Sequence, residues 1–320
     1  MSHSYKPSEA LQRGRDIDRF QAMGGQPLCL TAPAKINLYL KIIRRRRDGY
    51  HELNTLMQKL ALYDELELSL VPESGIHLFC PGTDLPEDER NIVHRATRLF
   101  LDQTGRVDQG IRIVLKKNIP VAAGLGGGSS DAATVLTGLD NLLATGCSRD
   151  ELAEMGLDLG ADVPLFIHDM AAAWATGIGE KLEIAVPLAG YRVLLVNPGI
   201  GVSTKWAYET FALTAAGKKI NLFGSQKEQS EIERPVSFCK RQIKPDELVN
   251  DLETITAEKY SVINTIKKRL LAAGAVGAMM SGSGPTVFGL FSSDMYEQAR
   301  LCCQELHDKY YQVYLVDPLV

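Results

Sequence analysis

Glycines, serines and an aspartate are concentrated in one short stretch of the chain. It reads Pro120-Val-Ala-Ala-Gly-Leu-Gly-Gly-Gly-Ser-Ser-Asp-Ala-Ala133, and a helix-forming run continues to Leu143. Glycine lets a backbone approach a ligand closely, and a helix start offers unpaired N–H groups and the positive end of the helix dipole. Phosphate is the usual anion in such a cradle. Ser129 or Ser130 could cap the helix and offer a hydroxyl to phosphate or to Mg²⁺.

Three common phosphate loops do not match this stretch. A Walker A loop ends in Gly-Lys-Ser/Thr, whereas Gly128 is followed directly by Ser129. A dinucleotide-binding G-x-G-x-x-G motif that began at Gly124 would need glycine at position 129. A protein-kinase glycine loop joins two strands, whereas this one opens a helix. A flexible turn before a helix is the remaining alternative, and the clustered glycines, the serine pair and the helix start disfavour it.

Two charged residues elsewhere could act on a bound phosphate group. Asp162 lies in the motif G-A-D-V-P, at a predicted helix-to-strand turn, where an aspartate is by default a turn or capping residue. Lys35 lies in A-P-A-K-I-N-L, whose small apolar flanks would leave its ammonium partly desolvated, although a lone lysine is usually a surface charge. Asn37 shares a strand face with Lys35. Asp131 is explained by the helix dipole alone, so we assign it no catalytic role.

Composition places the chain among ordinary globular proteins. The 320 residues are 45% hydrophobic and 23% charged, which suffices for one large domain or two smaller ones. A formal net charge of −4 gives no overall attraction to nucleic acid or membrane. The Arg44–Arg47 run is typical of a solvated turn between strands, with attraction of a phosphorylated substrate as the alternative.

Cysteine usage and hydropathy predict a cytoplasmic protein. The six cysteines show no C-x-x-C and no metal-ligand spacing, which is a reduced pattern rather than a disulfide framework. No apolar run approaches the length of a membrane-spanning helix. Residues 1–27 mix both charges and lack the apolar segment of a signal peptide, so we expect a disordered extension.

Hydrophobic periodicity predicts mixed strands and helices, hence an α+β architecture. Strands are expected at 28–43 (in two segments around Pro33), 58–70, 76–80, 110–116, 163–168, 171–176, 191–197, 275–281, 286–291 and 312–316. Helices are expected at 91–104, 132–143, 149–159, 203–213, 256–272 and 294–307. Residues 215–245 are polar and without periodicity, which favours a flexible segment over a functional lid.

Three segments together resemble the GHMP kinases, the family of galactokinase, homoserine kinase, mevalonate kinase and their relatives. The loop at 120–133 is similar to the family's phosphate-binding motif, Ala32–Leu38 to its first motif, and Met280–Phe288 to its third, in the expected order. The resemblance implies two domains with the active site in the cleft between them. We expect an N-terminal ATP-binding domain at 28–186, resembling the second domain of ribosomal protein S5, and a ferredoxin-like domain at 187–320.

The resemblance also implies a role for each candidate residue. Asp162 would be the catalytic base, and Lys35 would orient it and lower the pKa of the acceptor hydroxyl. Asn91, whose default role is to cap a helix, would contact adenine. ATP and Mg²⁺ would be required, and no residue is assigned as a metal ligand. The ATP phosphates would be held by Pro120, Ala122, Gly124, Leu125, Gly126, Gly127, Gly128, Ser129 and Ser130. The substrate side would be closed by Gly282, Ser283 and Gly284.

A second short string narrows the substrate class. Asp48-Gly-Tyr-His-Glu-Leu53 would by default be a hairpin turn and its exit, but that account leaves two adjacent aromatic rings unexplained. The string is similar to one in family members that phosphorylate a cytidyl diphosphate-linked methylerythritol on its 2-hydroxyl, in non-mevalonate isoprenoid precursor biosynthesis. There the Tyr50–His51 pair would grip cytosine, and Asn37 could hydrogen-bond the acceptor. Asn250-Asp-Leu-Glu253 agrees with the same members. We expect a monomer or weak homodimer.

Rival functions stay open at this point. Another GHMP kinase that acts on a small alcohol such as homoserine or mevalonate would have no need of a nucleobase clamp. A nucleotide-binding protein without catalysis would have no need of Lys35, Asp162 and the glycine loop together. A nucleic-acid binder is disfavoured by the acidic net charge.

Overall fold

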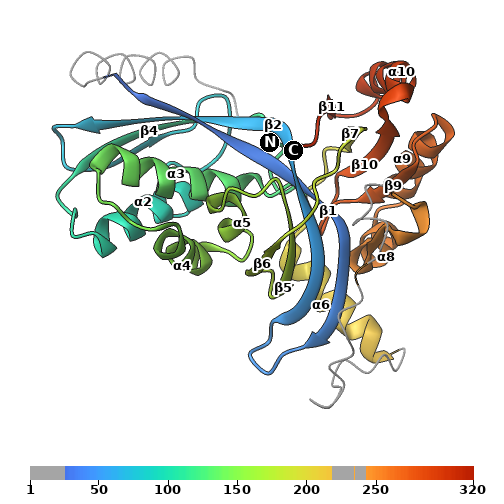
Figure 1. Ribbon diagram of the computed structural model, residues 1–320, viewed down its shortest axis with the longest axis horizontal. Helices are drawn as coiled ribbons and strands as arrows, with labels where there is room; N and C mark the ends of the chain where they lie inside the picture. Colours follow the sequence, from blue (N-terminus) through green and yellow to red (C-terminus); the bar gives the residue numbers. More distant parts are fainter. Residues whose placement is uncertain (1–25, 218–233, 235–242) are drawn as a thin grey trace, which may run out of the picture.

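The computed structural model describes residues 26–217, 234 and 243–320, which form two sheets with their helices (Figure 1). The predicted disordered extension at 1–27 and flexible segment at 215–245 therefore lie almost wholly outside the described residues.

The first sheet is built around two long strands. β1 (Leu28–Arg45) and β2 (His51–Val71) pair antiparallel along most of their length, and β2 then pairs with β4 (Gly110–Lys116) at one end and β5 (Ala172–Gly177) at the other. The full order is β3-β4-β2-β1-β8, and β6 joins through β5; the bounds are Gly75–Phe79 for β3, Lys181–Ile184 for β6 and Val249–Asn250 for β8.

Helices cover one face of this sheet (Figure 1). They are α2 (Ile92–Gln103), α3 (Gly127–Leu143), α4 (Arg149–Leu159) and α5 (Val163–Ile167). Leu66, Leu68, Ile111 and Ile113 alternate along β2 and β4 and are fully buried with the apolar faces of these helices. The alternation that predicted the strands is therefore the alternation that fills the core.

The second sheet has the connectivity expected for a ferredoxin-like domain. Its strands are β7 (Tyr191–Asn197), β9 (Gly277–Met280), β10 (Val287–Ser292) and β11 (Gln312–Val316), in the order β11-β7-β10-β9 with antiparallel neighbours. Helices α6 (Thr204–Gly217), α8 (Asp251–Lys259) and α9 (Val262–Ala272) follow the first strand, and α10 (Tyr296–His307) follows the third. Short 3₁₀ turns occupy Pro245–Glu247 and Ser293–Met295. The chain thus runs β-α-β-β-α-β, and the predicted α+β two-domain fold is confirmed.

Several element predictions were wrong in instructive ways. The predicted strand 163–168 is instead helix α5 (Val163–Ile167), because Pro164 suits the first turn of a helix and a short apolar run does not distinguish a helix from a strand. The predicted helix 256–272 is two helices, α8 and α9, separated at Tyr260. β1 is one strand, with a register shift between Pro33 and Ala34 instead of a break. The two-residue β8 and the exposed β6 were missed.

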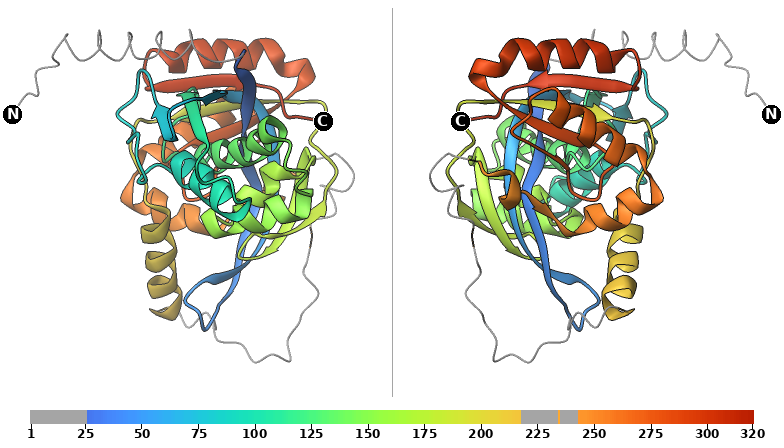
Figure 2. Two further views of the ribbon diagram at one scale, coloured as in Figure 1. Left: turned by 90° about the vertical axis from the view of Figure 1, so that its left-hand side faces the viewer. Right: turned by 90° about the vertical axis from the view of Figure 1, so that its right-hand side faces the viewer.

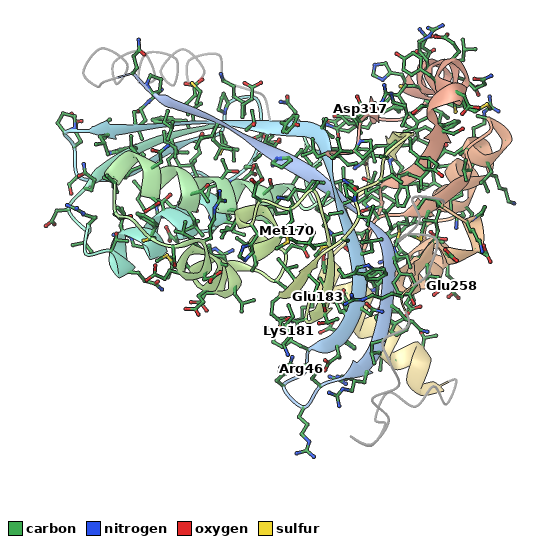
Figure 3. The ribbon with its side chains drawn as sticks, in the orientation of Figure 1. Arg46, Met170, Lys181, Glu183, Glu258 and Asp317 are labelled. Carbon is green, nitrogen blue, oxygen red and sulfur yellow. The ribbon has the colours of Figure 1, made fainter. Side chains whose placement is uncertain are left out.

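The two halves are joined by more than the chain connections. Gln58 on β2 donates from Nε2 to the Leu319 carbonyl (2.8 Å) and accepts at Oε1 from the Leu188 N–H (2.7 Å). β8 comes from the second half of the sequence yet pairs with β1. Figure 2 shows the end of the β1–β2 hairpin (blue) projecting from the rest of the first sheet with α6 (yellow) beside it. Arg46, which is paired with Asp48, lies at the hairpin tip (Figure 3). Among the described residues, no helix is long and apolar enough to cross a membrane.

Candidate active site

Lys35 and Asp162 meet where β1 passes the start of α5. Lys35 Nζ lies 3.2 Å from Asp162 Oδ2 and donates to Asn37 Oδ1 at 2.7 Å. The Lys35 side chain is only 5% exposed, whereas that of Asp162 is 35% exposed and faces the cavity described below. The ammonium is therefore held by a carboxylate and an amide, while the carboxylate keeps room to contact a ligand. The prediction that Lys35 and Asn37 share one strand face is confirmed, and the contact between them is an addition from the structure.

Asp162 occupies the N-cap position of α5, although its side chain makes no capping hydrogen bond. The predicted helix-to-strand turn is a turn between the helices α4 and α5, since Val163–Ile167 is helical. A capping residue whose carboxylate is not used for capping is free for another role. Its contact with Lys35 gives it a fixed direction.

The glycine loop lies directly on Lys35. The Lys35 N–H donates to the Leu125 carbonyl at 2.9 Å, and a Cβ added at Gly126 would lie 2.9 Å from Lys35 Cγ. Gly124 (φ 77°) and Gly126 (φ 71°) adopt left-handed conformations, and so does Ala122 (φ 52°). Non-glycine residues rarely adopt this conformation, and they do so most often at functional sites.

Helix α3 begins inside the glycine loop rather than after it. Its N-cap is Gly126, without a side-chain cap, so the prediction that Ser129 or Ser130 caps the helix was wrong. The first amides of a helix, here those of Gly127, Gly128 and Ser129, have no intrahelical acceptor. Ser129 lines the cavity, whereas Ser130 is fully buried and is not among the lining residues. A phosphate-binding role therefore fits Ser129 and does not fit the Ser130 hydroxyl.

A buried ion cluster lies beneath the loop, and sequence reasoning missed two of its members. Lys117 Nζ is paired with Asp64 Oδ2 and lies 2.6 Å from Asp131 Oδ2. Asp64 Oδ1 also accepts the N–H groups of Asn118 (2.6 Å) and Ile119 (2.8 Å), whereas Asp131 Oδ1 is buried without a partner among the described residues. A Cβ at Gly127 would lie 3.2 Å from Lys117 Nζ, so the cluster is in contact with the phosphate loop.

The cluster holds two carboxylates and one ammonium, and their hydrogen bonds decide which carboxylate gains a proton. Burial raises the pKa of Asp131 to about 7, with the nearby Asp64 carboxylate adding to the rise and Lys117 opposing it. Lys117 donates to both carboxylates, but Asp64 also accepts two backbone N–H groups and Asp131 accepts none from the described residues, so Asp131 is the group that becomes neutral. Despite its burial, Lys117 has a raised pKa because both carboxylates stabilise its charge.

Two stacked aromatic rings, one from β2 and one from α6, form the aromatic wall that lines another part of the site. The His51 ring stacks on Tyr208 of α6 with centroids 5.4 Å apart and an interplanar angle of 23°. His51 Nε2 is buried and has no hydrogen-bond partner among the described residues. Burial, and then the Arg45 charge, lower the His51 pKa, so the imidazole is neutral near pH 7. Tyr50, by contrast, is 61% exposed at the rim.

Tyr208 was missed by the sequence analysis although a signal was present. The α6 residues that line the cavity recur at helical spacing, as one face of a helix does: Thr204, Tyr208 and Ala212. Burial and the Asp162 carboxylate raise the pKa of Tyr208, which lines the same cavity as the Lys35–Asp162 pair.

The third motif forms a turn that touches both the loop and β1. Ser281 Oγ donates to the Gly124 carbonyl at 2.9 Å and lies 3.3 Å from the Asn37 N–H, which donates to it. Gly282 and Ser283 line the cavity, but Gly284 does not and instead donates its N–H to the Ser281 carbonyl. A Cβ on Gly124 would lie 2.1 Å from the Ser281 carbonyl oxygen, so this glycine lets the two motifs touch.

One cavity of about 1820 Å³ is lined by the Lys35–Asp162 pair, the glycine loop, His51 and Tyr208. Sites for a single small ligand are about 300–1,000 Å³, so two ligands can be accommodated.

Asn91 also lines this cavity, but its side-chain amide is already hydrogen-bonded within the protein. Oδ1 accepts the Val93 N–H and so caps α2, and Nδ2 donates to the Pro86 carbonyl. Over the described ranges, no cluster of three or more His, Cys, Asp or Glu side chains could hold a metal ion by itself.

Comparisons with known proteins identify the family of this chain. Family models described as the GHMP kinases N-terminal domain and GHMP kinases C-terminal match residues 91–170 and 241–308. A 4-diphosphocytidyl-2-C-methyl-D-erythritol kinase of Desulfotalea psychrophila is 47% identical over 285 residues, covering 88% of this chain and 92% of the relative. Another kinase of that name, from Syntrophotalea carbinolica, is 45% identical over 289 residues and covers 90% and 98%.

Solved structures give the same result at the level of the fold. A crystal structure of 4-(cytidine 5'-diphospho)-2C-methyl-D-erythritol kinase matches with a TM-score of 0.72 and 33% identity, covering 90% of this chain and 98% of that one. A homoserine kinase from Cytophaga hutchinsonii matches with a TM-score of 0.66 at 20% identity, covering 92% and 95%, and shares the fold alone.

Proposed function

The chain belongs to the GHMP kinase family, and we propose that it transfers the γ-phosphoryl group of ATP to the 2-hydroxyl of 4-diphosphocytidyl-2-C-methyl-D-erythritol. This reaction belongs to non-mevalonate isoprenoid precursor biosynthesis. One observation carries the proposal: a single cavity joins the phosphate loop, the Lys35–Asp162 pair and the His51–Tyr208 wall. Its size suits a nucleotide and a second, nucleotide-linked substrate together.

The start of α3 suits the phosphates of ATP. Gly127, Gly128 and Ser129 line the cavity at the positive end of the helix dipole, where their amides have no intrahelical acceptor. Bound Mg²⁺ would neutralise charge on the phosphates during transfer. Mg²⁺ commonly keeps several waters and few protein ligands, which fits a site where Ser129 offers a hydroxyl beside the Asp162 carboxylate. Ser129 Oγ would be only 3.9 Å from a Cβ on Gly160, two residues before Asp162.

The Lys35–Asp162 pair supplies the acceptor side of the reaction. The Asp162 carboxylate, which faces the cavity, accepts the proton of the attacking hydroxyl. Lys35, held by Asn37 and Asp162, fixes the direction of that carboxylate and places a positive charge where negative charge gathers on the transferred group. Phosphoryl transfer depends mainly on such positioning and charge stabilisation.

The cytidine end of the substrate fits the aromatic wall. His51 lines the cavity with a neutral imidazole whose Nε2 has no hydrogen-bond partner among the described residues, and Tyr50 at the rim offers a ring face for stacking. Gly282 and Ser283 line the same cavity as this wall and the phosphate loop, and they would contact the diphosphate of the substrate. A small alcohol substrate would leave the aromatic wall without a ligand.

One chain supplies all of these groups, which favours action as a monomer or weak homodimer. The cysteines at 29, 80, 147, 302 and 303 are free thiols, a state typical of the reducing cytoplasm. We therefore place the reaction there.

Phosphorus NMR of the reaction mixture tests the proposed function directly. The purified protein is mixed with ATP, Mg²⁺ and the cytidyl substrate. We expect ADP and a new phosphomonoester resonance to grow in equal amounts while the cytidyl diphosphate resonances persist. Formation of ADP with inorganic phosphate alone, or no consumption of ATP, would contradict the proposal.

A further inference from the structure

Asn250 contacts the third-motif turn through the nitrogen of its side-chain amide. Nδ2 donates to the carbonyls of Met280 and Gly282, both at 2.8 Å. Oδ1 accepts the Leu252 N–H at 3.0 Å and so caps helix α8. The residue is only 8% exposed, and it is not among those that line the active-site cavity. Any effect of Asn250 on the reaction would therefore pass through the turn.

The residues that follow Asn250 anchor it to both sides of the active site. Asp251 Oδ2 accepts the Ile42 N–H of β1 at 2.7 Å, and Glu253 Oε2 accepts the Met280 N–H at 2.7 Å. Strand β8 also pairs in parallel with β1, with Asn250 opposite Leu40. The segment Asn250–Glu253 thus connects β1, the strand that carries Lys35, to the third-motif turn through hydrogen bonds.

Peptide geometry links Asn250 to the cavity. In a trans peptide the carbonyl and the following N–H point in opposite directions. Because the Gly282 carbonyl points to Asn250, the Ser283 N–H points away from it, and Ser283 lines the cavity. Within the part of the chain that the structure describes, this N–H donates to no acceptor. Ser283 Oγ is engaged separately, 3.0 Å from Thr204 Oγ1.

We propose that Asn250 is a positioning residue: its two N–H donors fix the Gly282–Ser283 peptide so that the Ser283 N–H points at an anionic phosphate oxygen of the bound substrates. The inference rests on the proposed kinase function and adds a residue outside the cavity to it. A turn held by two hydrogen bonds from one buried amide does not have to reorganise when charge develops, and such preorganised donors contribute strongly to catalysis.

The decisive variant is Asn250→Asp. An aspartate caps a helix as well as asparagine does, so the α8 cap persists, but both donors to the turn are lost. We expect kcat with the cytidyl substrate to fall by at least about 10-fold, toward the 10²–10³-fold seen when a transition-state donor is removed. Hydrogen exchange of the Ser281–Gly284 turn should become faster. KM for ATP should change less than kcat.

Two further variants separate positioning from stability. Ser148→Ala removes the cap of α4, a helix whose cap does not touch the turn, and serves as the matched control for a lost cap. Asn250→Ala removes both the α8 cap and the donors. The carboxyl in Asn250→Asp would face two carbonyls in a buried site, which favours its protonated form and restores one donor at low pH. The activity of Asn250→Asp relative to wild type should therefore rise as pH is lowered, while that of Asn250→Ala should not.

The outcomes distinguish this inference from the proposed function. If wild type phosphorylates the cytidyl substrate and Asn250→Asp retains kcat within about twofold, with unchanged exchange at the turn, the inference is wrong and the proposed function stands. If wild type shows no transfer, the proposed function fails. The exchange measurement still decides whether Asn250 orders the turn, and unchanged exchange there would overturn the inference on its own.

Discussion

Lys35 and Asp162 illustrate how one ion pair can divide two tasks between unequal environments. Lys35 is buried and bound by Asn37 and Asp162, whereas Asp162 is more exposed to the cavity, so the lysine is a fixed charge and the aspartate is the group that meets the substrate. An exposed surface pair would hold neither side chain in place. Because Lys35 is buried and held in place, it fixes the orientation of the Asp162 carboxylate.

Replacement of either member should remove activity and leave the fold. Asp162→Asn keeps the size of the side chain but removes the proton acceptor, and we expect kcat to fall by about 10²–10⁴-fold. Lys35→Met removes the positioned charge and should cost about 10²–10³-fold. Steady-state kinetics check the loss, with thermal unfolding as the control for folding. Turnover of a folded Asp162→Asn protein within a few-fold of wild type would exclude the proposed base.

The buried cluster predicts a pH-dependent difference in stability. Asp131 has a folded-state pKa of about 7, above its unfolded value of 3.8. Its stabilising contribution is therefore complete below the unfolded pKa and is lost as pH rises through about 7. Wild type should thus lose stability relative to Asp131→Asn between pH 5 and pH 8. We expect about 1 kcal/mol or more, because one pKa unit corresponds to about 1.4 kcal/mol.

Urea unfolding of both proteins at pH 5 and pH 8 measures this difference, and all other titrating groups are common to the two proteins. A stability difference that does not change with pH, or that grows in favour of wild type as pH rises, would contradict the assignment of the neutral carboxyl to Asp131.

Among the residue contacts of the site, the sequence predicted only those between residues that are close together in the chain. Lys35 and Asn37 share a face because they are two apart on a strand, and this held. Lys117 and Asp64 are separated by 53 residues, and they meet only through the pairing of β2 with β4. No local pattern shows such a contact. Tyr208 meets His51 for the same reason, through packing of α6 on the hairpin.

Among the elements, the glycine loop contains glycines with two different roles. Gly124, Gly126 and Gly127 are required by contacts inside the protein, with Ser281, Lys35 and Ile119 respectively. A Cβ at Gly128 would meet only Ile92, at an ordinary 3.6 Å, and Gly128 lines the cavity. The first three glycines shape the loop, and the fourth keeps space free for a ligand.

Gly128→Ala should therefore weaken ATP binding without harm to the fold. Alanine in a helix is favoured over glycine by about 0.5–1 kcal/mol, so the unfolding midpoint should stay level or rise. ATP affinity should fall by about tenfold, the equivalent of 1.4 kcal/mol. Gly126→Ala is the contrast, because its left-handed backbone (φ 71°) makes a Cβ cost about 1–2 kcal/mol. Calorimetry that finds unchanged ATP affinity for Gly128→Ala would remove Gly128 from the phosphate site.

The sequence predicted most elements of this fold, and its errors came from short segments. Four spans agree at both ends: 110–116, 149–159, 191–197 and 312–316. Val163–Ile167 was assigned the wrong type because five apolar residues fit either period. β8 has two residues and exists only because α8 is tied to β1. Long periodic segments carry their own signal, and short ones depend on partners elsewhere.

For the whole molecule, the aromatic wall around His51 predicts that substitutions there affect the cytidyl substrate and not ATP. Tyr50→Ala should weaken binding of the cytidyl substrate by about 1–3 kcal/mol, or roughly 5- to 150-fold, because stacking on the cytosine is lost. His51→Ala should have a similar effect through lost contact with the base edge. KM for ATP should change little, because the glycine loop holds that nucleotide. Competition by free CMP against the substrate measures the site directly, and equal weakening of both nucleotides would show that these residues act on the fold instead.

The most direct test compares acceptor substrates in one coupled assay of ATP consumption. The wild-type protein is given the cytidyl substrate, homoserine, mevalonate or galactose at matched concentrations, and kcat/KM is measured for each. A site built around a nucleobase should favour the cytidyl substrate by at least about 10³-fold, because a smaller alcohol leaves buried polar groups such as His51 Nε2 unpaired. An equal or higher kcat/KM for any of the three small alcohols would contradict the account.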